Sequence, residues 1–222
     1  MQNFDSQAMS IEEFRPKKLP GRRYLIRAAV ALILRPSDKG TQVLMMRRSE
    51  REGDPWSGHM AFPGGKKDRD DSSTFITALR ETEEEIGIER PERLQAIGRL
   101  SDVLTRPHSG KRPMVVTPFV FALHEDVQFK PNHEVAELVW IPLDYLANRA
   151  HREKMRWKHS GMEITLPCYF YNQQRIWGLS LTMLDELVGL LFRQTFPDTH
   201  SRMQFRPRGA RQYVYRAIRK IW

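Results

Sequence analysis

The sequence has little of what marks secreted or membrane-spanning proteins. Cys168 is its one cysteine, which excludes a disulfide within the chain. The longest apolar run, Ala28 to Leu34, is far too short to span a bilayer. The N-terminal segment Met1 to Lys18 has no apolar core of signal-peptide length. These absences predict a soluble protein of the reducing cytoplasm.

Acidic residues are also in the minority. The 222 residues include 36 Lys and Arg against 27 Asp and Glu, which gives a net charge of +9. Such a charge predicts attraction to phosphates, nucleic acid or an anionic membrane, without choosing among them. Hydrophobic residues make up 40% of the chain, which suits one large domain with a substantial core.

The pattern along the chain predicts a domain over residues 24–196, with a polar lead-in over residues 1–23 and a basic extension over residues 197–222. We expect regular structure to begin after Arg23. Apolar composition and alternation predict strands over residues 24–34, 41–47, 94–103, 114–123 and 135–141, and a hairpin around Ser160–Gly161. Helical spacing predicts helices over residues 74–86 and 180–192, and a short one after Pro142. This order favours an α+β fold, an α/β/α sandwich with a mixed β-sheet.

The acidic residues that the chain does have gather on one predicted helix, residues 74–86. Its apolar face differs from the face that carries three carboxylates within an arc of about 100°, which are Glu81, Glu84 and Glu85. Glu83 lies outside this arc. Carboxylates beside the bare carbonyls of Gly64–Gly65 form a hard oxygen site suited to Mg²⁺ or Mn²⁺. A solvated acidic helix face is the alternative.

The motif around this helix is specific. The run "RETEEEIGI" from Arg80 to Ile88, with Gly64–Gly65 before it, resembles the signature of the Nudix hydrolase family. Three features depart from that signature: Asp71 stands where a Glu is expected, one extra residue precedes Arg80, and Thr82 replaces an aliphatic residue. The resemblance implies a Nudix fold, a divalent metal cofactor and hydrolysis of a diphosphate linkage.

A second motif narrows the resemblance. The run "GHMAFPGG" and the extra residue are features of the coenzyme A diphosphatase branch of the family, and the likeness extends over residues 27–192. This branch expects Arg-Ser, three residues and then Arg upstream of the Gly. Here Arg48-Ser49 is followed by Arg51, out of register, in a loop one residue longer. The branch implies cleavage of coenzyme A or an acyl derivative to adenosine 3′,5′-bisphosphate and a 4′-phosphopantetheine product.

The resemblance also assigns roles within the site. It implies that metal is bound by Gly64, through its carbonyl, and by Glu81, Glu84 and Glu85. It implies that Arg80 orients Glu81 through a salt bridge. The general base comes either from the motif itself or from a later loop, where Glu134 is the candidate and Glu137 the second choice.

Basic side chains in adjoining strands and loops are candidates for binding substrate phosphates: Arg47, Arg48, Lys66, Arg106, Lys111 and Arg112. Trp56 and Phe62 either stack on an adenine or pack their loop, and packing is favoured for Phe62. If the branch assignment fails, ADP-ribose, NADH, another dinucleotide or a nucleoside triphosphate is the alternative substrate. A nucleic-acid-binding module that keeps the fold without catalysis is the rival from a different class.

The extension ends in a patterned segment. From Gly209 to Trp222, apolar residues recur at three- and four-residue intervals and basic residues occupy the opposite face, which predicts an amphipathic C-terminal helix. It packs on its own domain or on a partner subunit of a homo-oligomer, lies on an anionic membrane, or contacts nucleic acid. Packing is favoured, because most amphipathic helices bury their apolar stripe.

Overall fold

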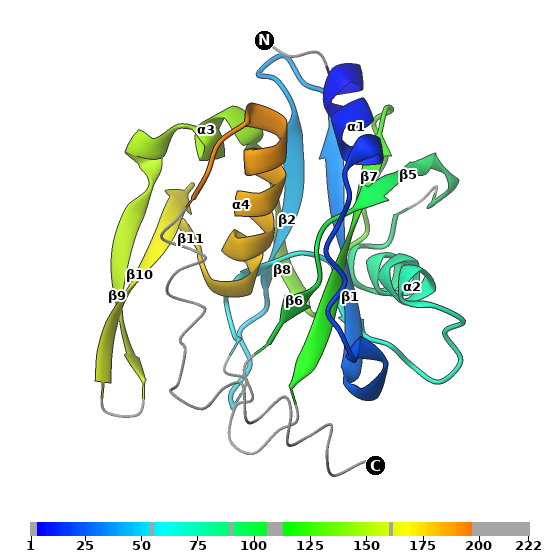
Figure 1. The fold of residues 1–222 in the computed structure, drawn as a ribbon, viewed down its shortest axis with the longest axis horizontal. Coiled ribbons are helices and arrows are strands. Elements are labelled where there is room, and N and C mark those ends of the chain that lie inside the picture. The colour runs from blue at the N-terminus through cyan, green and yellow to red at the C-terminus, as the bar shows by residue number, and fades with distance from the viewer. Residues whose placement is uncertain (1–3, 54–55, 89–90, 106–112, 160–161, 197–222) are drawn as a thin grey trace.

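A computed structural model of the chain describes residues 4–53, 56–88, 91–105, 113–159 and 162–196. Its main element is an eight-stranded sheet with α2 (Thr74–Ile86) on one face and α1 (Phe4–Glu13) and α4 (Gly178–Phe192) on the other, as Figure 1 shows. The strands are β1 (Ile26–Arg35), β2 (Gln42–Arg48), β3 (Met60–Ala61), β4 (Gly64–Lys66), β5 (Leu94–Arg99), β6 (Val103–Leu104), β7 (Met114–Leu123) and β8 (Val135–Pro142). These layers confirm the predicted α/β/α sandwich.

The sheet is mixed, as the sequence predicts. Its central path is β3-β2-β1-β7-β5, with β8 beside β2, β4 beside β1 and β6 beside β7. β1 and β7 run parallel, in a register from Ile26 opposite Met114 to Leu34 opposite Ala122, and the other pairs are antiparallel. β1 and β2 pair as an antiparallel hairpin. A parallel pair between strands so far apart in sequence is not visible from local patterns.

Two hydrophobic cores flank the sheet because successive side chains of a strand point to opposite faces. In β1, Ala31 and Ile33 belong to the core under α2. Leu32 and Leu34 belong to the core under α1 and α4. All four are fully or almost fully buried, and burying a large aliphatic side chain contributes about 1.5–3 kcal/mol. The central strand is therefore apolar throughout.

Helix α2 forms over the predicted residues, with a cap at each end. At its start, Ser73 accepts a hydrogen bond from the backbone N–H of Ile76, which satisfies an otherwise unpaired donor. At its end, Gly87 adopts a left-handed conformation with φ 55°, which glycine tolerates best. Thr82 and Ile86 are buried against the sheet and Glu83 is exposed. The caps fix where the helix begins and ends, and the buried side chains set which face meets the sheet.

A smaller three-stranded sheet extends from the body and contains β9 (Glu153–His159), β10 (Met162–Tyr171) and β11 (Gln174–Ile176). β9 and β10 pair as the predicted hairpin, which lies alongside α4 at the left of Figure 1. The connections contain α3 (Leu143–Ala147), the helix expected after Pro142, and three 3-10 helices, η1 (Arg22–Tyr24), η2 (Pro91–Arg93) and η3 (Arg149–His151). No helix in the described ranges is long and apolar enough to cross a membrane.

The expectation that structure begins after Arg23 is wrong, because residues Phe4–Glu13 form α1. Phe4, Gln7 and Ile11 are its buried residues, and their spacing places them on one helical face. Ile11 packs so closely on β5 that a Cβ at Gly98 would lie 2.9 Å from its Cγ2 atom. Because polar residues separate Phe4, Gln7 and Ile11, the apolar spacing of this helix is too weak to be recognised in the sequence. The basic extension, residues 197–222, lies outside the described residues.

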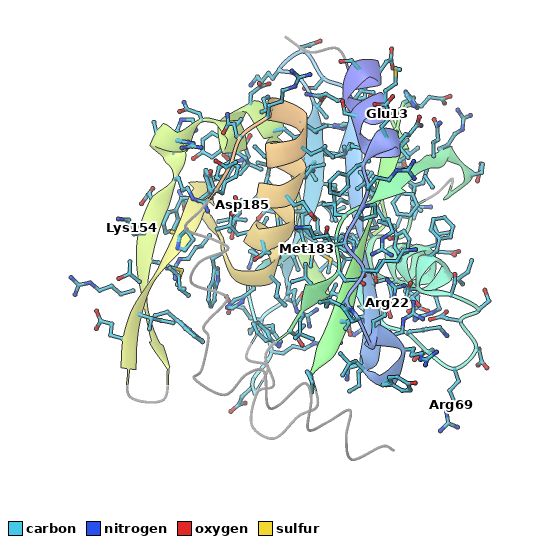
Figure 2. All side chains as sticks on the ribbon, viewed as in Figure 1. Glu13, Arg22, Arg69, Lys154, Met183 and Asp185 are labelled. Carbon is cyan, nitrogen blue, oxygen red and sulfur yellow. The ribbon has the colours of Figure 1, made fainter. Side chains whose placement is uncertain are left out.

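The segment that follows α1 is anchored by one buried carboxylate, Asp102. Its side chain is 0% exposed and accepts hydrogen bonds from Leu19 N (3.0 Å), Arg22 Nη1 (2.8 Å to Oδ2), Arg99 Nη2 (2.7 Å) and Thr117 Oγ1 (2.9 Å). Figure 2 labels Arg22 at this junction. Burial alone would raise the pKa of Asp102, but these hydrogen bonds and the charge of Arg99 together lower it. Asp102 therefore joins the N-terminal segment to the sheet.

Candidate active site

The acidic face of α2 lies against the glycines of β4. Gly64 N donates a hydrogen bond of 2.8 Å to Glu85 Oε2. A Cβ at Gly65 would lie 2.2 Å from Glu81 Oε1, so the Glu81 carboxylate rests directly on the glycine backbone. Two of the predicted carboxylates are therefore brought to β4.

Gly64 also has to be glycine for its own backbone. Its φ is 154°, and a Cβ there would lie 2.3 Å from Ala29 O on the neighbouring strand β1. A side chain at either glycine would push β4 away from β1 or from α2. The Gly-Gly pair thus allows the sheet and the carboxylates to approach each other.

Glu85 is the most buried of the acidic residues on this helix. Only 4% of its surface is exposed, and burial raises its pKa to about 7. The charges of Glu81 and Glu134 contribute to this rise in pKa, while the Gly64 N–H and the charge of Arg48 oppose it. A group that ionises near neutral pH among other acids favours the arrival of a positive charge.

The other two carboxylates differ from Glu85 and from each other. Burial raises the pKa of Glu81, and the neighbouring Arg80 opposes that rise. Glu84 is 54% exposed at its side chain, and its Oε2 lies 3.0 Å from Arg80 Nη1. In this conformation Glu84 is held by arginine rather than turned toward Glu81 and Glu85.

Arg80 makes the predicted salt bridge with Glu81, at 3.0 Å from Nη2 to Oε1. Its main partner, however, is Asp71, a residue that departs from the Nudix signature. Arg80 Nε and Nη2 donate to the two oxygens of Asp71, each at 3.1 Å. Asp71 also accepts from Thr77 Oγ1 at 2.9 Å and from Asp68 N at 3.0 Å. Its hydrogen bond with Arg80 lowers the pKa of Asp71 and raises that of Arg80.

The loop before α2 therefore orients Arg80, and through it Glu81. Figure 2 shows Arg69 of this loop pointing away from the body, whereas Asp71 is 5% exposed. The signal for this role was present in the sequence, because Asp71 occupies the position where the family signature has a Glu. Its carboxylate has a shorter arm but the same charge.

Glu134 is fixed beside the carboxylates by the end of α2. Asn132 Nδ2 donates to Glu84 O at 2.8 Å, and Asn132 N donates to Glu85 O at 2.9 Å. Asn132 Oδ1 in turn accepts from Glu134 N at 2.8 Å. The Glu134 side chain pairs with Arg51 Nη1 at 3.1 Å. Sequence reasoning missed Asn132, which no motif marks.

The predicted phosphate-binding residues separate into two groups. Arg48 lies close enough to lower the pKa of Glu85, and the Lys66 carbonyl accepts from Arg80 Nη2 at 3.3 Å. Arg47 instead shares a face of β2 with the core under α4, and its Nε lies 3.6 Å from Glu137 Oε2. Arg47 and Glu137 therefore point away from the Glu85 face. Arg106, Lys111 and Arg112 lie outside the described residues.

The oxygen atoms gathered at this site are of the chemical type that binds a divalent cation. Carboxylate oxygens are the ligands that Mg²⁺ and Mn²⁺ prefer, and Glu81 and Glu85 converge on the β4 backbone. Across the described ranges, no three His, Cys, Asp or Glu side chains are arranged as ready metal ligands. Glu84, the third predicted carboxylate ligand, is paired with Arg80 instead.

Solved structures with a related fold include two hydrolases. A Caenorhabditis elegans Ap4A hydrolase, in a binary complex, is 22% identical with a TM-score of 0.45, over 55% of this chain and 83% of that one. The Nudix hydrolase RenU of Mycobacterium smegmatis is 26% identical with a TM-score of 0.43, over 55% of this chain and 74% of that one.

Sequence comparison decides the family. The NUDIX domain profile matches residues 25–160. A protein of Pectobacterium atrosepticum named uncharacterized Nudix hydrolase NudL is 34% identical, over 66% of this chain and 74% of the relative. Its namesake in Photorhabdus laumondii is 30% identical, over 78% of this chain and 87% of the relative. The chain belongs to the Nudix hydrolase family.

Proposed function

We propose that the chain hydrolyses the diphosphate of coenzyme A or an acyl-coenzyme A. The products are adenosine 3′,5′-bisphosphate and 4′-phosphopantetheine or its acyl form. Membership of the family makes the chain a pyrophosphatase-type hydrolase that acts on nucleoside diphosphate derivatives. The run "GHMAFPGG" before the acidic helix supports the coenzyme A branch.

The observation that carries the proposal is the approach of Glu81 and Glu85 to the Gly64–Gly65 backbone. Nudix hydrolases generally use divalent metal ions. Glu81, Glu84, Glu85 and the Gly64 carbonyl would hold Mg²⁺ or Mn²⁺ here. When bound, the ion supplies positive charge that offsets the charge of the diphosphate.

The residues of the chain then carry out the remaining tasks. Asp71 and Arg80 hold the Glu81 carboxylate in position. Arg48 provides positive charge beside Glu85 for a phosphate oxygen. Water attacks one phosphorus, the bridging P–O bond breaks, and a carboxylate accepts the proton of the water. Glu134 is the proposed base, because Asn132 holds its backbone beside Glu84 and Glu85.

A second candidate differs in substrate alone. The loop between β2 and β3 is one residue longer than the branch pattern, and Arg51 within it pairs with Glu134. This departure favours another nucleoside diphosphate derivative, such as ADP-ribose, NADH or a nucleoside triphosphate. The pairing places the altered loop next to the proposed base, where it affects which leaving group is accepted.

The decisive experiment is product analysis. The full chain is incubated with Mg²⁺ and, separately, with coenzyme A, ADP-ribose, NADH and nucleoside triphosphates, and the products are separated by chromatography. Glu81→Gln removes the proposed ligand, and Glu83→Gln is the matched control, because Glu83 lies on the same helix but is exposed.

We expect adenosine 3′,5′-bisphosphate from coenzyme A with the wild type and Glu83→Gln, and none with Glu81→Gln. Cleavage of another compound alone would favour the second candidate. If no compound is cleaved, the non-catalytic nucleic-acid-binding module becomes the better account of the positive charge.

Location in the cytoplasm and packing of the basic extension stay predictions. Deleting residues 209–222 tests the latter. If the predicted helix packs on the domain or on a partner subunit, deletion changes stability or oligomeric state and leaves RNA and liposome binding unaltered. Loss of a salt-sensitive affinity for RNA or anionic liposomes would instead assign the segment to those partners.

A further inference from the structure

Four aromatic rings from three separate segments form a continuous series at one end of the sheet. We call Trp56, His59, Trp157 and Trp177 the aromatic series. Ring centroids lie 5.8 Å apart for Trp56 and His59, 5.2 Å for His59 and Trp177, and 5.8 Å for Trp157 and Trp177. The contacts are edge-to-face or tilted, which is the favourable arrangement for neighbouring aromatic rings.

The segments that meet here are the β2–β3 loop, the residue before α4 and the hairpin strand β9. Figure 1 shows β9 and β10 running beside α4 and past its lower, N-terminal end. Trp177 is the N-cap residue of α4, and His59 directly precedes β3. The aromatic series thus connects the smaller sheet to the body of the protein.

The loop that carries Trp56 and His59 is linked to the carboxylates through two arginines. His59 O accepts a hydrogen bond of 3.0 Å from Arg48 N, and Arg48 is the arginine whose charge acts on Glu85. Ser57 Oγ accepts one of 2.9 Å from Arg51 N, and the Arg51 side chain pairs with Glu134. The loop that carries Trp56 is therefore bonded to two arginines, one of which acts on Glu85 and the other of which pairs with Glu134.

Burial changes along the aromatic series. His59, Trp157 and Trp177 are partly buried, whereas Trp56 is 50% exposed. Half of the Trp56 surface is therefore left uncovered, although a tryptophan has much apolar surface that burial would remove from water. The exposed ring belongs to the loop in which Arg51 N donates to Ser57 Oγ and Arg48 N donates to His59 O.

We propose that Trp56, supported by the rest of the aromatic series, stacks on the purine base of the nucleotide substrate. The inference rests on the proposed function only for placing the diphosphate beside Glu85. An aromatic side chain recognises the π-face of a base, whereas a pantetheine arm has no such face. Arg48, between the aromatic series and Glu85, would lie along the phosphates that join base and reaction centre.

The test is equilibrium binding to the full chain without turnover. The probes are AMP and adenosine 3′,5′-bisphosphate, which contain the base, and 4′-phosphopantetheine, which does not. The variants are Trp56→Ala and Trp56→Phe. Tyr24→Ala is the matched control, since Tyr24 is another aromatic residue that is 42% exposed and belongs to η1.

We expect Trp56→Ala to weaken binding of both adenine nucleotides by about 10-fold, within the range for loss of one stacked base. Trp56→Phe should keep most of the affinity, because phenylalanine retains a ring. Binding of 4′-phosphopantetheine should not change, and Tyr24→Ala should match the wild type for every probe.

Unchanged adenine affinity in Trp56→Ala would overturn the inference. So would an equal loss for all three probes, which would indicate collapse of the loop, and so would a loss confined to 4′-phosphopantetheine. The two proposals fail separately: a wild type that binds AMP through Trp56 but does not cleave coenzyme A refutes the substrate assignment alone.

Discussion

Asp102 and Glu85 are both buried carboxylates, yet their surroundings shift their pKa values in opposite directions. Around Asp102, two arginines, a threonine hydroxyl and a backbone N–H donate hydrogen bonds, and its pKa is lowered. Glu85 receives one hydrogen bond, from Gly64 N, and its acidic neighbours Glu81 and Glu134 help to raise its pKa to about 7.

The difference is the one expected between a structural carboxylate, Asp102, and a proposed metal ligand, Glu85. A buried charge is tolerated when it is paired and hydrogen-bonded, and Asp102 meets that condition within the chain. Glu81 is paired with Arg80 at 3.0 Å, but Glu85 meets the condition less well, because its one hydrogen bond comes from a backbone N–H and the charges of Glu81 and Glu134 act against its ionised form. The proposed cation would supply the positive charge that Glu85 needs. Perturbed acids that gather in this way mark functional sites more often than ordinary surface charge does.

The largest expected effect is on catalysis at the acidic face. Glu81→Gln removes a charge from the proposed metal site while it keeps the shape of the side chain. We expect kcat to fall by roughly 10²–10⁴-fold, with little change in the melting temperature. Steady-state assays with Mg²⁺ beside Glu83→Gln measure it, and an equal fall in both variants would contradict the assignment.

The matching change at the structural carboxylate should act on stability instead. Asp102→Asn leaves Arg22 and Arg99 without their charged partner, and we expect the free energy of unfolding at pH 7 to fall by about 3 kcal/mol. Because the folded pKa of Asp102 is lowered, its contribution is present above the unfolded value near 3.9 and is lost as pH falls through the folded pKa.

Urea unfolding of wild type and Asp102→Asn between pH 3 and pH 8 measures this difference. The kcat of the folded variant should stay within a few-fold of the wild type, because Asp102 contacts none of the carboxylates of the proposed metal site. A large loss of kcat in a protein that remains folded would remove the contrast between the two regions.

Glu85 should show the opposite dependence on pH when divalent cations are absent. Its folded pKa is about 7 and an unfolded Glu titrates near 4.3, so between these values the folded chain binds more protons. The free energy of unfolding that depends on Glu85 therefore falls as pH rises through this window. Glu85→Gln should abolish this decrease in the free energy of unfolding.

We expect Glu85→Gln to be more stable than the wild type by about 1–3 kcal/mol at pH 8, and to differ little from it at pH 4.5. Chemical unfolding in the presence of a chelator tests this. If the variant is less stable at pH 8, the buried acid is already compensated within the chain.

A smaller effect is expected where Asp71 positions Arg80. Asp71→Asn keeps the size of the side chain but weakens both hydrogen bonds to the guanidinium. We expect kcat to fall about 10-fold, the lower end for partners that orient a metal ligand, with KM nearly unchanged. Asp71→Glu restores the charge and should recover most of the loss. A change in KM alone would argue for direct contact with substrate.

The smallest effect belongs to Arg51, whose pair with Glu134 is 43% and 34% exposed at the two side chains. Exposed pairs contribute about 0.2–1 kcal/mol, so Arg51→Ala should leave the unfolding curve almost unaltered. The substitution should instead alter substrate preference: we expect the ratio of kcat/KM for coenzyme A to that for ADP-ribose to change by a few-fold. An unchanged ratio would show that this loop does not contribute to substrate selectivity.

The acidic face of α2 was more predictable from sequence than the surroundings of Asp102. Helix α2, its stop at Gly87 and the face that carries Glu81 and Glu85 follow from helical spacing and one motif. Those signals are local. Asp102 gives no such signal, because Leu19 and Thr117, which bind it, are distant in the chain.

The errors have a common physical origin. The apolar stripe of α1 contains only a few residues separated by polar ones, so packing rather than propensity forms that helix. Arg47 was placed at the site by its position in sequence, and strand alternation turned it to the other face. Asn132 and the preference of Arg80 for Asp71 depend on tertiary contacts.

The central claim is that Glu81 and Glu85 together bind a divalent cation beside the β4 backbone. Calorimetric titration of Mn²⁺ into the wild type, Glu81→Gln, Glu85→Gln and Glu83→Gln tests it most directly. We predict that the wild type and Glu83→Gln bind with the same affinity and that the other two variants lose at least 10-fold. Unaltered binding in Glu85→Gln, or an equal loss in Glu83→Gln, would contradict the account.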